Sequence, residues 1–231
     1  SIHKLVPISV KRELEVGVSW LEGKIYNNYF KGQPKHISLA DTAYKNLPGE
    51  HNRQNILTAI TIAMSLGIEL SDYLLNIING FTSLPHRLEL VYSSEKLSIY
   101  NDSKATNMDA ASKALASFNN ILWLAGGRLK DHNFTAVLPC LDKVSKIYAF
   151  GEAAPTLVDY FSGKIEIASF SRLKEALLAA WSDAKKGGTI SSKVILLAPG
   201  GSSFDEFTNF EHRGDSYRTW AKELSQLSEY K

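Results

Sequence analysis

Four short apolar runs, separated by stretches with helical spacing, constrain the fold of this 231-residue chain more than any other feature. The apolar runs are residues 121–125, 147–150, 165–168 and 194–198. The helical stretches lie around residues 134–141, 153–161 and 171–185, with a last one at about residues 216–227. Continuous apolar strands that alternate with helices are typical of a parallel sheet covered on both faces. Because such crossovers are right-handed, we predict an α/β fold with a doubly wound, mostly parallel, Rossmann-like sheet.

The first 85 residues have a different pattern. Alternation over residues 14–20 and 25–30 predicts two strands joined by a tight turn, and residues 40–48 are expected to form a loop. From Gly49 onward, the apolar spacing predicts a helix buried on most of its faces, with a second helix at about residues 70–79. Such a small strand-and-helix unit must lean on further structure.

The best domain boundary lies at Pro85, where the composition is that of a loop. We therefore expect one domain at residues 1–85 and another at residues 86–231. The chain begins at Ser1 without a methionine, which fits either a piece of a longer protein or removal of an initiator methionine.

Composition argues against several classes of function. The 26 basic and 24 acidic residues leave a net charge of +2, which gives no reason to expect nucleic acid or an anionic membrane as a partner. No apolar run approaches the roughly 18 residues of a membrane span, and no signal peptide is recognised. The single cysteine, Cys140, cannot form an internal disulfide, and it fits inert packing in a reducing cytoplasm.

Residues 100–107 gather polar groups between a strand pattern and a helix pattern. In open α/β sheets, ligands bind at such carboxyl ends of strands, and the free N–H groups of the following helix favour an anion. Asp102 could accept a hydrogen bond from a ribose or an amine, and Lys104 could hold a carboxylate or a phosphate. Thr106 or Asn107 could cap the helix. The alternative is an ordinary capped turn with solvated charges.

Two further polar loops follow strands of the same predicted sheet. Residues 126–131 contain two glycines, which allow a backbone to approach a ligand, and Lys130 supplies a positive charge. Residues 199–205 again place glycines and hydroxyl groups at a strand end. Either loop alone is weak evidence. Because the carboxyl ends of parallel strands share one edge, the three loops together predict a ligand site there.

Two other places have polar residues with a possible role in binding. Asn52 and Asn55 are three residues apart, so they share one face of the first turns of their helix and could read the edge of a planar ligand. The alternative is a helix cap and a solvent-facing amide. Arg87 opens the next strand, either as a phosphate clamp or as a surface charge.

The motifs that carry covalent or metal chemistry are missing. The sequence contains no G-x-x-x-x-G-K-[ST] phosphate loop and no G-x-S-x-G nucleophile elbow. It has no cluster of His, Cys or carboxylate residues with the spacing of metal ligands. We therefore predict a site for binding and orientation, with no catalytic nucleophile and no metal ligand in this chain.

In this order, the motifs resemble the later half of a Mur ligase. The Gly-Glu-His-Asn-x-x-Asn run at residues 49–55 is similar to the helix start that holds adenine in that family. Leu-Pro-His-Arg at residues 84–87 resembles the junction between its central and C-terminal domains. Residues 101–107, 126–130 and 203–214 resemble motifs of its D-glutamate-adding branch. Residues 1–85 would then be a remnant of the central ATP-binding domain, and residues 86–231 the C-terminal domain.

The resemblance implies part of an ATP-dependent amide-bond ligase of peptidoglycan precursor synthesis. Such an enzyme adds D-glutamate to UDP-N-acetylmuramoyl-L-alanine through an acyl phosphate. By this resemblance, ATP is contacted by Asn52 and Asn55 at adenine, Arg87 at the phosphates and Asp102 at the ribose. D-Glutamate is contacted by Lys104, Thr106, Lys130, Ser203 and the backbone near Phe210.

The family's uridine-nucleotide domain, phosphate loop and Mg²⁺ ligands have no counterpart in this sequence. ATP and Mg²⁺ are therefore expected to act in a full-length enzyme, and this chain is expected to be inactive alone. The resemblance also implies a monomer in the bacterial cytoplasm. Two alternatives remain open: another Mur or folylpolyglutamate-type ligase, and a stand-alone, non-catalytic binding module of the same fold.

Overall fold

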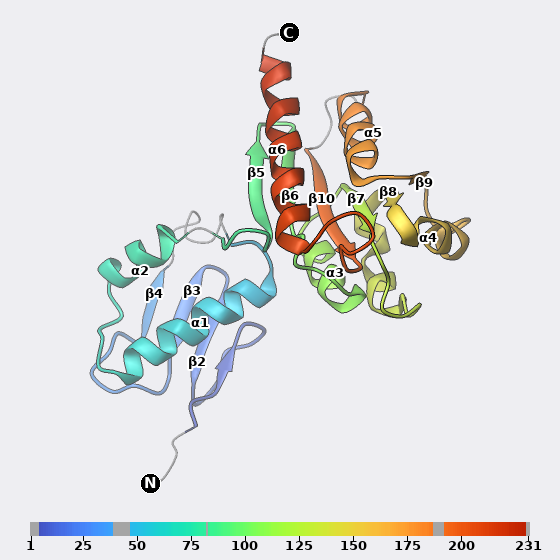
Figure 1. The fold of residues 1–231 in the computed structure, drawn as a ribbon. Coiled ribbons are helices and arrows are strands. Elements are labelled where there is room, and N and C mark those ends of the chain that lie inside the picture. The colour runs from blue at the N-terminus through green and yellow to red at the C-terminus, as the bar shows by residue number, and fades with distance from the viewer. Residues whose placement is uncertain (1–4, 39–46, 82, 187–191, 230–231) are drawn as a thin grey trace. The chain divides into compact units, whose positions relative to one another are not determined.

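The computed structural model describes residues 5–38, 47–81, 83–186 and 192–229 (Figure 1). The chain forms two compact units, Ser1–Thr82 and Ser83–Lys231. Most of the loop expected at residues 40–48 lies outside the described residues. None of the helices in the described part of the chain is long and apolar enough to cross a membrane.

The first unit contains a small mixed sheet and two helices. The strands, in their order in the sheet, are β1 (Ile8–Ser9), β2 (Val18–Leu21), β3 (Lys24–Asn27) and β4 (His36–Ser38). The helices are α1 (Glu50–Ser65) and α2 (Asp72–Asn79). The predicted turn is confirmed, because β2 and β3 pair across Glu22 and Gly23, which both have positive φ. Both strands are shorter than predicted. Trp20, Ile25 and Leu57 lie in one hydrophobic core, which joins the sheet to α1.

The second unit is built on a six-stranded sheet. In their order in the sheet, the strands are β5 (Glu89–Ser93), β6 (Leu97–Asn101), β10 (Lys193–Gly200), β7 (Ile121–Gly126), β8 (Val144–Phe150) and β9 (Ile167–Phe170). All neighbours are parallel except β5, which is antiparallel to β6. The predicted α/β class with a mostly parallel sheet is confirmed. The last strand, β10, lies between β6 and β7, so the central strands come from distant parts of the sequence (Figure 1).

Helical segments cover both faces of this sheet, as a doubly wound fold requires. One face packs against α3 (Met108–Leu115), the 3₁₀ segment Thr135–Lys143 and α4 (Ala154–Phe161). The other face packs against α5 (Leu173–Lys186) and α6 (Phe210–Glu229). The chain crosses from β6 to β7 on one face and reaches β10 on the other. The carboxyl ends of these three strands are therefore the switch point of the sheet.

Two predicted segments differ from the structure for local reasons. The helical stretch at residues 134–141 is a 3₁₀ segment, because Pro139 inside it has no N–H to donate. The last helix begins at Phe210 rather than near residue 216. There the Asn209 side chain accepts a hydrogen bond from the His212 N–H at 2.7 Å and caps the helix. The sequence pattern did not predict this first turn, because it contains no long apolar repeat and is followed by Gly214, a poor helix former.

Candidate functional site

The loops that follow β6, β7 and β10 meet at the carboxyl edge of the sheet, as the sequence predicted. The Gly200 N–H donates to the Ala105 carbonyl at 2.9 Å. Arg128 and Ser202 exchange backbone hydrogen bonds of 2.9 and 2.8 Å. These bonds join the β10 loop to both neighbouring loops. Polar residues separated by up to about a hundred positions in the sequence therefore form one rim.

Asp102 is held tightly at the start of the β6 loop. Its N–H donates to the Leu197 carbonyl at 2.8 Å, and its Oδ1 accepts from the Leu88 N–H at 3.2 Å. Burial raises the pKa of Asp102 to about 6, although the Leu88 hydrogen bond and the charge of Arg87 oppose this rise. Asn107, rather than Thr106, caps α3, since its Oδ1 accepts from the Ala110 N–H at 2.8 Å.

The structure brings Lys104 and Phe210 together. The Lys104 ammonium lies 3.8 Å from the centre of the Phe210 ring, which is a cation–π contact. Ser103, next to Lys104, donates its hydroxyl to the Phe210 carbonyl at 2.8 Å. The first turn of α6 is thereby attached to the β6 loop. Two residues predicted to contact the same ligand are direct neighbours.

The other residues predicted to contact D-glutamate have unused polar groups. Lys130 is exposed and Thr106 is half-buried, and among the described residues neither side chain has a hydrogen bond or ion pair. Ser203 is buried, and its carbonyl accepts the N–H groups of Glu206 and Phe207. Its hydroxyl has no hydrogen-bond partner in the described part of the chain. These three side chains therefore have polar groups that are not used within the described residues, although Ser203 itself is only 2% exposed.

The candidates for ATP binding are divided between the two units. Asn52 and Asn55 lie in the first turns of α1, in the first unit, while Arg87 and Asp102 lie in the second. The Asn52 amide donates to the Pro48 carbonyl at 2.8 Å, and Asn55 is exposed. Arg87 is exposed beside the β5–β6 hairpin. Two of these four side chains, Asn55 and Arg87, are therefore exposed to solvent.

Arg213 had no role in the sequence-based prediction, although it lies in one of the motifs that carry the resemblance. Its side chain is completely buried, and it donates to Ser103 Oγ, to the Ser103 carbonyl and to the Gly201 carbonyl at 3.0, 2.9 and 3.1 Å. Burial lowers the pKa of Arg213 to about 10, while Asp205 and Glu206 oppose that change. Since charged residues are rarely buried, nothing in the sequence indicated an internal role for Arg213.

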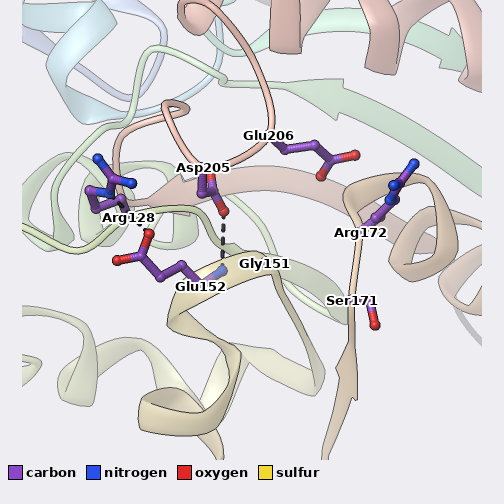
Figure 2. Close-up of a pocket in the computed structure, with 7 residues that line it drawn as sticks. All are labelled: Arg128, Gly151, Glu152, Ser171, Arg172, Asp205 and Glu206. Atoms are coloured by element: carbon purple, nitrogen blue, oxygen red, sulfur yellow. Dashed lines mark hydrogen bonds and ion pairs between the residues drawn. The ribbon is translucent and has the colours of Figure 1, made fainter.

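A polar pocket of about 460 Å³ lies beside this rim, at the ends of β8 and β9 (Figure 2). It is lined by Arg128, Gly151, Glu152, Ser171, Arg172, Asp205 and Glu206. Figure 2 shows Asp205 and Glu206 between the two arginines. Much of this charge is already paired, because Arg128 Nε lies 2.9 Å from Glu152 Oε2 and Asp205 Oδ2 accepts the Glu152 N–H at 3.1 Å. Arg128 and Asp205 belong to two of the loops that the sequence predicted to form the site, whereas nothing in the sequence indicated the lining residues that follow β8 and β9.

The described residues hold no site in which protein side chains alone surround a metal ion. They contain no group of three or more His, Cys, Asp or Glu side chains arranged to hold a metal ion. Mg²⁺ is usually bound by one or two carboxylates together with substrate phosphates and water. We assign no Mg²⁺ ligand to the described residues and derive no step from a metal here.

A doubly wound sheet whose polar loops meet at its switch point defines an α/β ligand-binding domain. Its N–H groups, hydroxyls and lysines suit a small anionic ligand. Residues 86–201 match the family model described as Mur ligase, glutamate ligase domain. Because this match covers half of the chain, the chain belongs to the Mur ligase family.

Curated relatives agree with this family. A protein of Rickettsia bellii named UDP-N-acetylmuramoylalanine–D-glutamate ligase is 36% identical over 214 residues, which cover 93% of this chain and 46% of that protein. A protein of the same name from Rhodospirillum rubrum is 35% identical over 228 residues, with 96% of this chain and 46% of the relative covered. The chain thus spans about half the length of the curated relatives it matches.

Solved structures support the fold. UDP-N-acetylmuramate-alanine ligase from Thermotoga maritima matches with a TM-score of 0.59 at 17% identity, over 94% of this chain and 48% of that one. Folylpolyglutamate synthase from Mycobacterium tuberculosis, solved with ADP and AMPPCP, matches with a TM-score of 0.54 at 17% identity, over 85% and 42%. At this identity the likeness shows the fold alone.

Proposed function

We propose that this chain is the later half of an ATP-dependent ligase that joins D-glutamate to UDP-N-acetylmuramoyl-L-alanine in peptidoglycan precursor synthesis. The observation that carries the proposal is the 36% identity over 93% of the chain to a relative named for that reaction. Residues 86–231 are the glutamate ligase domain in this proposal, and residues 1–85 are the end of the central ATP-binding domain. The enzyme acts as a monomer in the bacterial cytoplasm.

D-Glutamate has two carboxylates, and the rim of the second unit offers matching donors. The Lys130 ammonium binds one carboxylate through a charge-assisted hydrogen bond, which is stronger than a bond between neutral groups. The hydroxyls of Thr106 and Ser203 and the backbone near Phe210 complete the site. Lys104 stays on the Phe210 ring and adds positive charge close by. The unpartnered state of Lys130, Thr106 and the Ser203 hydroxyl supports this assignment.

In the proposed enzyme, the contacts with ATP are those that the family resemblance implies. Asn52 and Asn55 contact adenine, Asp102 accepts a hydrogen bond from the ribose, and Arg87 contacts the phosphates. ATP phosphorylates the carboxylate of the nucleotide precursor, and the amine of D-glutamate attacks the resulting acyl phosphate. The C–N bond forms as phosphate leaves and the amine loses a proton. Arg87 offsets negative charge during phosphoryl transfer, and Mg²⁺ belongs to the part of the enzyme outside this chain.

The test is phosphate release by a full-length enzyme that contains this chain, with UDP-N-acetylmuramoyl-L-alanine and either D- or L-glutamate. We expect turnover with D-glutamate only, and no turnover by the 231-residue chain alone. Lys130→Met is expected to raise the KM for D-glutamate about 10-fold or more, since it removes a charged partner from a carboxylate. Lys113→Met, at another exposed lysine of the same unit, is the matched control. Turnover with L-glutamate but not with D-glutamate would disprove the assignment.

A further inference from the structure

Arg213 is a buried cation at the meeting point of the ligand-binding loops. It lies on the first turn of α6, and its side chain has no exposed surface. Burying a guanidinium group is costly unless its donors are satisfied. Three of its nitrogen atoms donate hydrogen bonds, two of them to Ser103 and one to the Gly201 carbonyl. The guanidinium therefore links α6 to two loops from different strands.

Each of these bonds leads to a residue of the proposed D-glutamate site. Gly201 lies two positions before Ser203 in the β10 loop. Ser103 precedes Lys104, and its hydroxyl both accepts from Arg213 Nε at 3.0 Å and donates to the Phe210 carbonyl at 2.8 Å. A displacement of the guanidinium thus shifts both loops and the first turn of α6 together.

The surrounding glycines show how closely the loops fit around this side chain. Gly127 has a φ of +93°, and a Cβ there would lie 3.0 Å from Arg213 NH1 and 2.2 Å from the Ser202 carbonyl. A Cβ on Gly201 would lie 2.7 Å from the Gly126 carbonyl. The β7 and β10 loops therefore approach to a distance that only glycine permits. Arg213 lies against Gly127 of the β7 loop and donates hydrogen bonds to the Gly201 carbonyl of the β10 loop and the Ser103 carbonyl of the β6 loop.

We propose that Arg213 is a positioning residue, which sets the geometry of the D-glutamate site without contacting the substrate. This inference rests on the proposed function. Three hydrogen bonds in a rigid planar fork fix the relative positions of Ser203, the Lys104–Thr106 segment and Phe210. A lysine keeps the charge but has no planar fork, so it cannot hold all three acceptors at once.

The position of Asp102 depends on other contacts. Its backbone is bound to Leu197 and its carboxylate to Leu88, and neither contact involves Arg213. Loss of the guanidinium is therefore expected to affect D-glutamate binding more than ATP binding. Such a separation distinguishes a positioning role from general loss of stability.

The experiment compares Arg213→Lys, Arg213→Met and Ser103→Ala in a full-length enzyme that contains this chain. Since small displacements of binding groups have large kinetic effects, we expect both Arg213 variants to raise the KM for D-glutamate about 10- to 100-fold. The KM for ATP should change less than about 3-fold. Ser103→Ala removes only the hydroxyl that connects Arg213 to the Phe210 carbonyl, so it should raise the KM for D-glutamate by a smaller factor. This variant keeps the test valid if the Arg213 variants do not fold.

Arg218→Met is the matched control. Arg218 lies on the same helix and is half-buried, but it pairs with Glu89 at 2.7 Å and with Asp215 at 3.1 Å and makes no hydrogen bond to Ser103 or Gly201. Its loss should lower stability and leave the KM for D-glutamate unchanged. An equal rise in KM in this variant, or an unchanged KM in Arg213→Lys and Ser103→Ala, would overturn the inference.

A second readout does not depend on activity. In the 231-residue chain, Arg213→Lys should speed amide hydrogen exchange at Gly200 and Arg128, whose N–H groups join the loops, about 10-fold or more. Arg218→Met should not. If the wild-type enzyme lacks D-glutamate-dependent turnover, the proposed function fails. Unchanged exchange in Arg213→Lys overturns the positioning role itself.

Discussion

Replacing Asp102 by asparagine is expected to stabilise the second unit at neutral pH, although the residue belongs to the proposed ATP site. Burial raises the pKa of this carboxyl group from 3.8 to about 6. A change of one in pKa corresponds to about 1.4 kcal/mol, so ionised Asp102 costs up to about 3 kcal/mol of folding free energy. The asparagine side chain would keep an oxygen that accepts the Leu88 N–H but would carry no charge.

The sign of the pH dependence follows from the direction of this shift. The native state binds the proton more tightly than the unfolded state does, so the contribution of Asp102 to stability falls as the pH rises from about 4 to about 6. It stays constant above that range. The advantage of the asparagine variant should therefore be near zero at about pH 4 and reach its full size, up to about 3 kcal/mol, above about pH 6.5.

Urea unfolding at several pH values measures this difference. The indole N–H of Trp123, which donates to the Ala198 carbonyl at 2.8 Å, provides an NMR signal specific to the second unit. Asp159→Asn, at an exposed position of α4, is the control and should change stability by less than about 0.5 kcal/mol at any pH. A lower stability of Asp102→Asn at neutral pH, or a gain that does not vary with pH, would refute the reasoning.

Two further substitutions test the packing of α6 and α5. Gly214→Ala should lower the free energy of unfolding by about 1–3 kcal/mol, because its Cβ would lie 2.1 Å from Nδ1 of the buried His86. In the control Gly80→Ala, the added Cβ makes only ordinary contacts and should have little effect. An unchanged melting temperature for Gly214→Ala would contradict this prediction. Asp183 accepts hydrogen bonds from Lys146 and Tyr148 at 3.0 and 2.9 Å, and these bonds lower its pKa. A lowered pKa stabilises the fold at pH values above the usual pKa of aspartate and not at lower pH. Asp183→Asn should therefore lower the free energy of unfolding by about 1 kcal/mol at neutral pH and leave it unchanged at strongly acidic pH. A loss of equal size at both pH values would contradict the assignment.

Local pattern was sufficient to predict the elements of the second unit but not their order in the sheet. The run at residues 194–198 predicts a strand because it is apolar and bounded by loops. Its place between β6 and β7 depends on which helix packs on which face, and no short stretch of sequence encodes that. The early start of α6 was missed because Gly214 breaks the helical pattern, although Asn209 is a regular capping residue.

The candidate site was predicted in part from the chemistry of its loops. Three polar loops after parallel strands must share an edge, so their convergence followed from the fold. The roles of Lys130, Thr106 and Ser203 came instead from the family resemblance, since a lysine and two hydroxyls at loop positions have many possible uses. Arg213 was missed because sequence alone cannot show that a charged residue on a helix is buried.

The structure also separates two kinds of residue within the motifs of these loops. The sequence suggested that glycines 126 and 127 allow a ligand to approach the backbone, and it placed glycines 200 and 201 at the same edge of the sheet. In the structure, Cβ atoms at these positions would collide with Phe150, Ser202, Met108 and Gly126. These glycines therefore serve the packing of the chain against itself, and so does the buried Arg213. No hydrogen-bond partner among the described residues engages the side chains of Lys130, Thr106 and Ser203. Substitutions at these three positions should therefore affect contacts with the substrate, whereas substitutions at the glycines and Arg213 should affect the geometry of the loops.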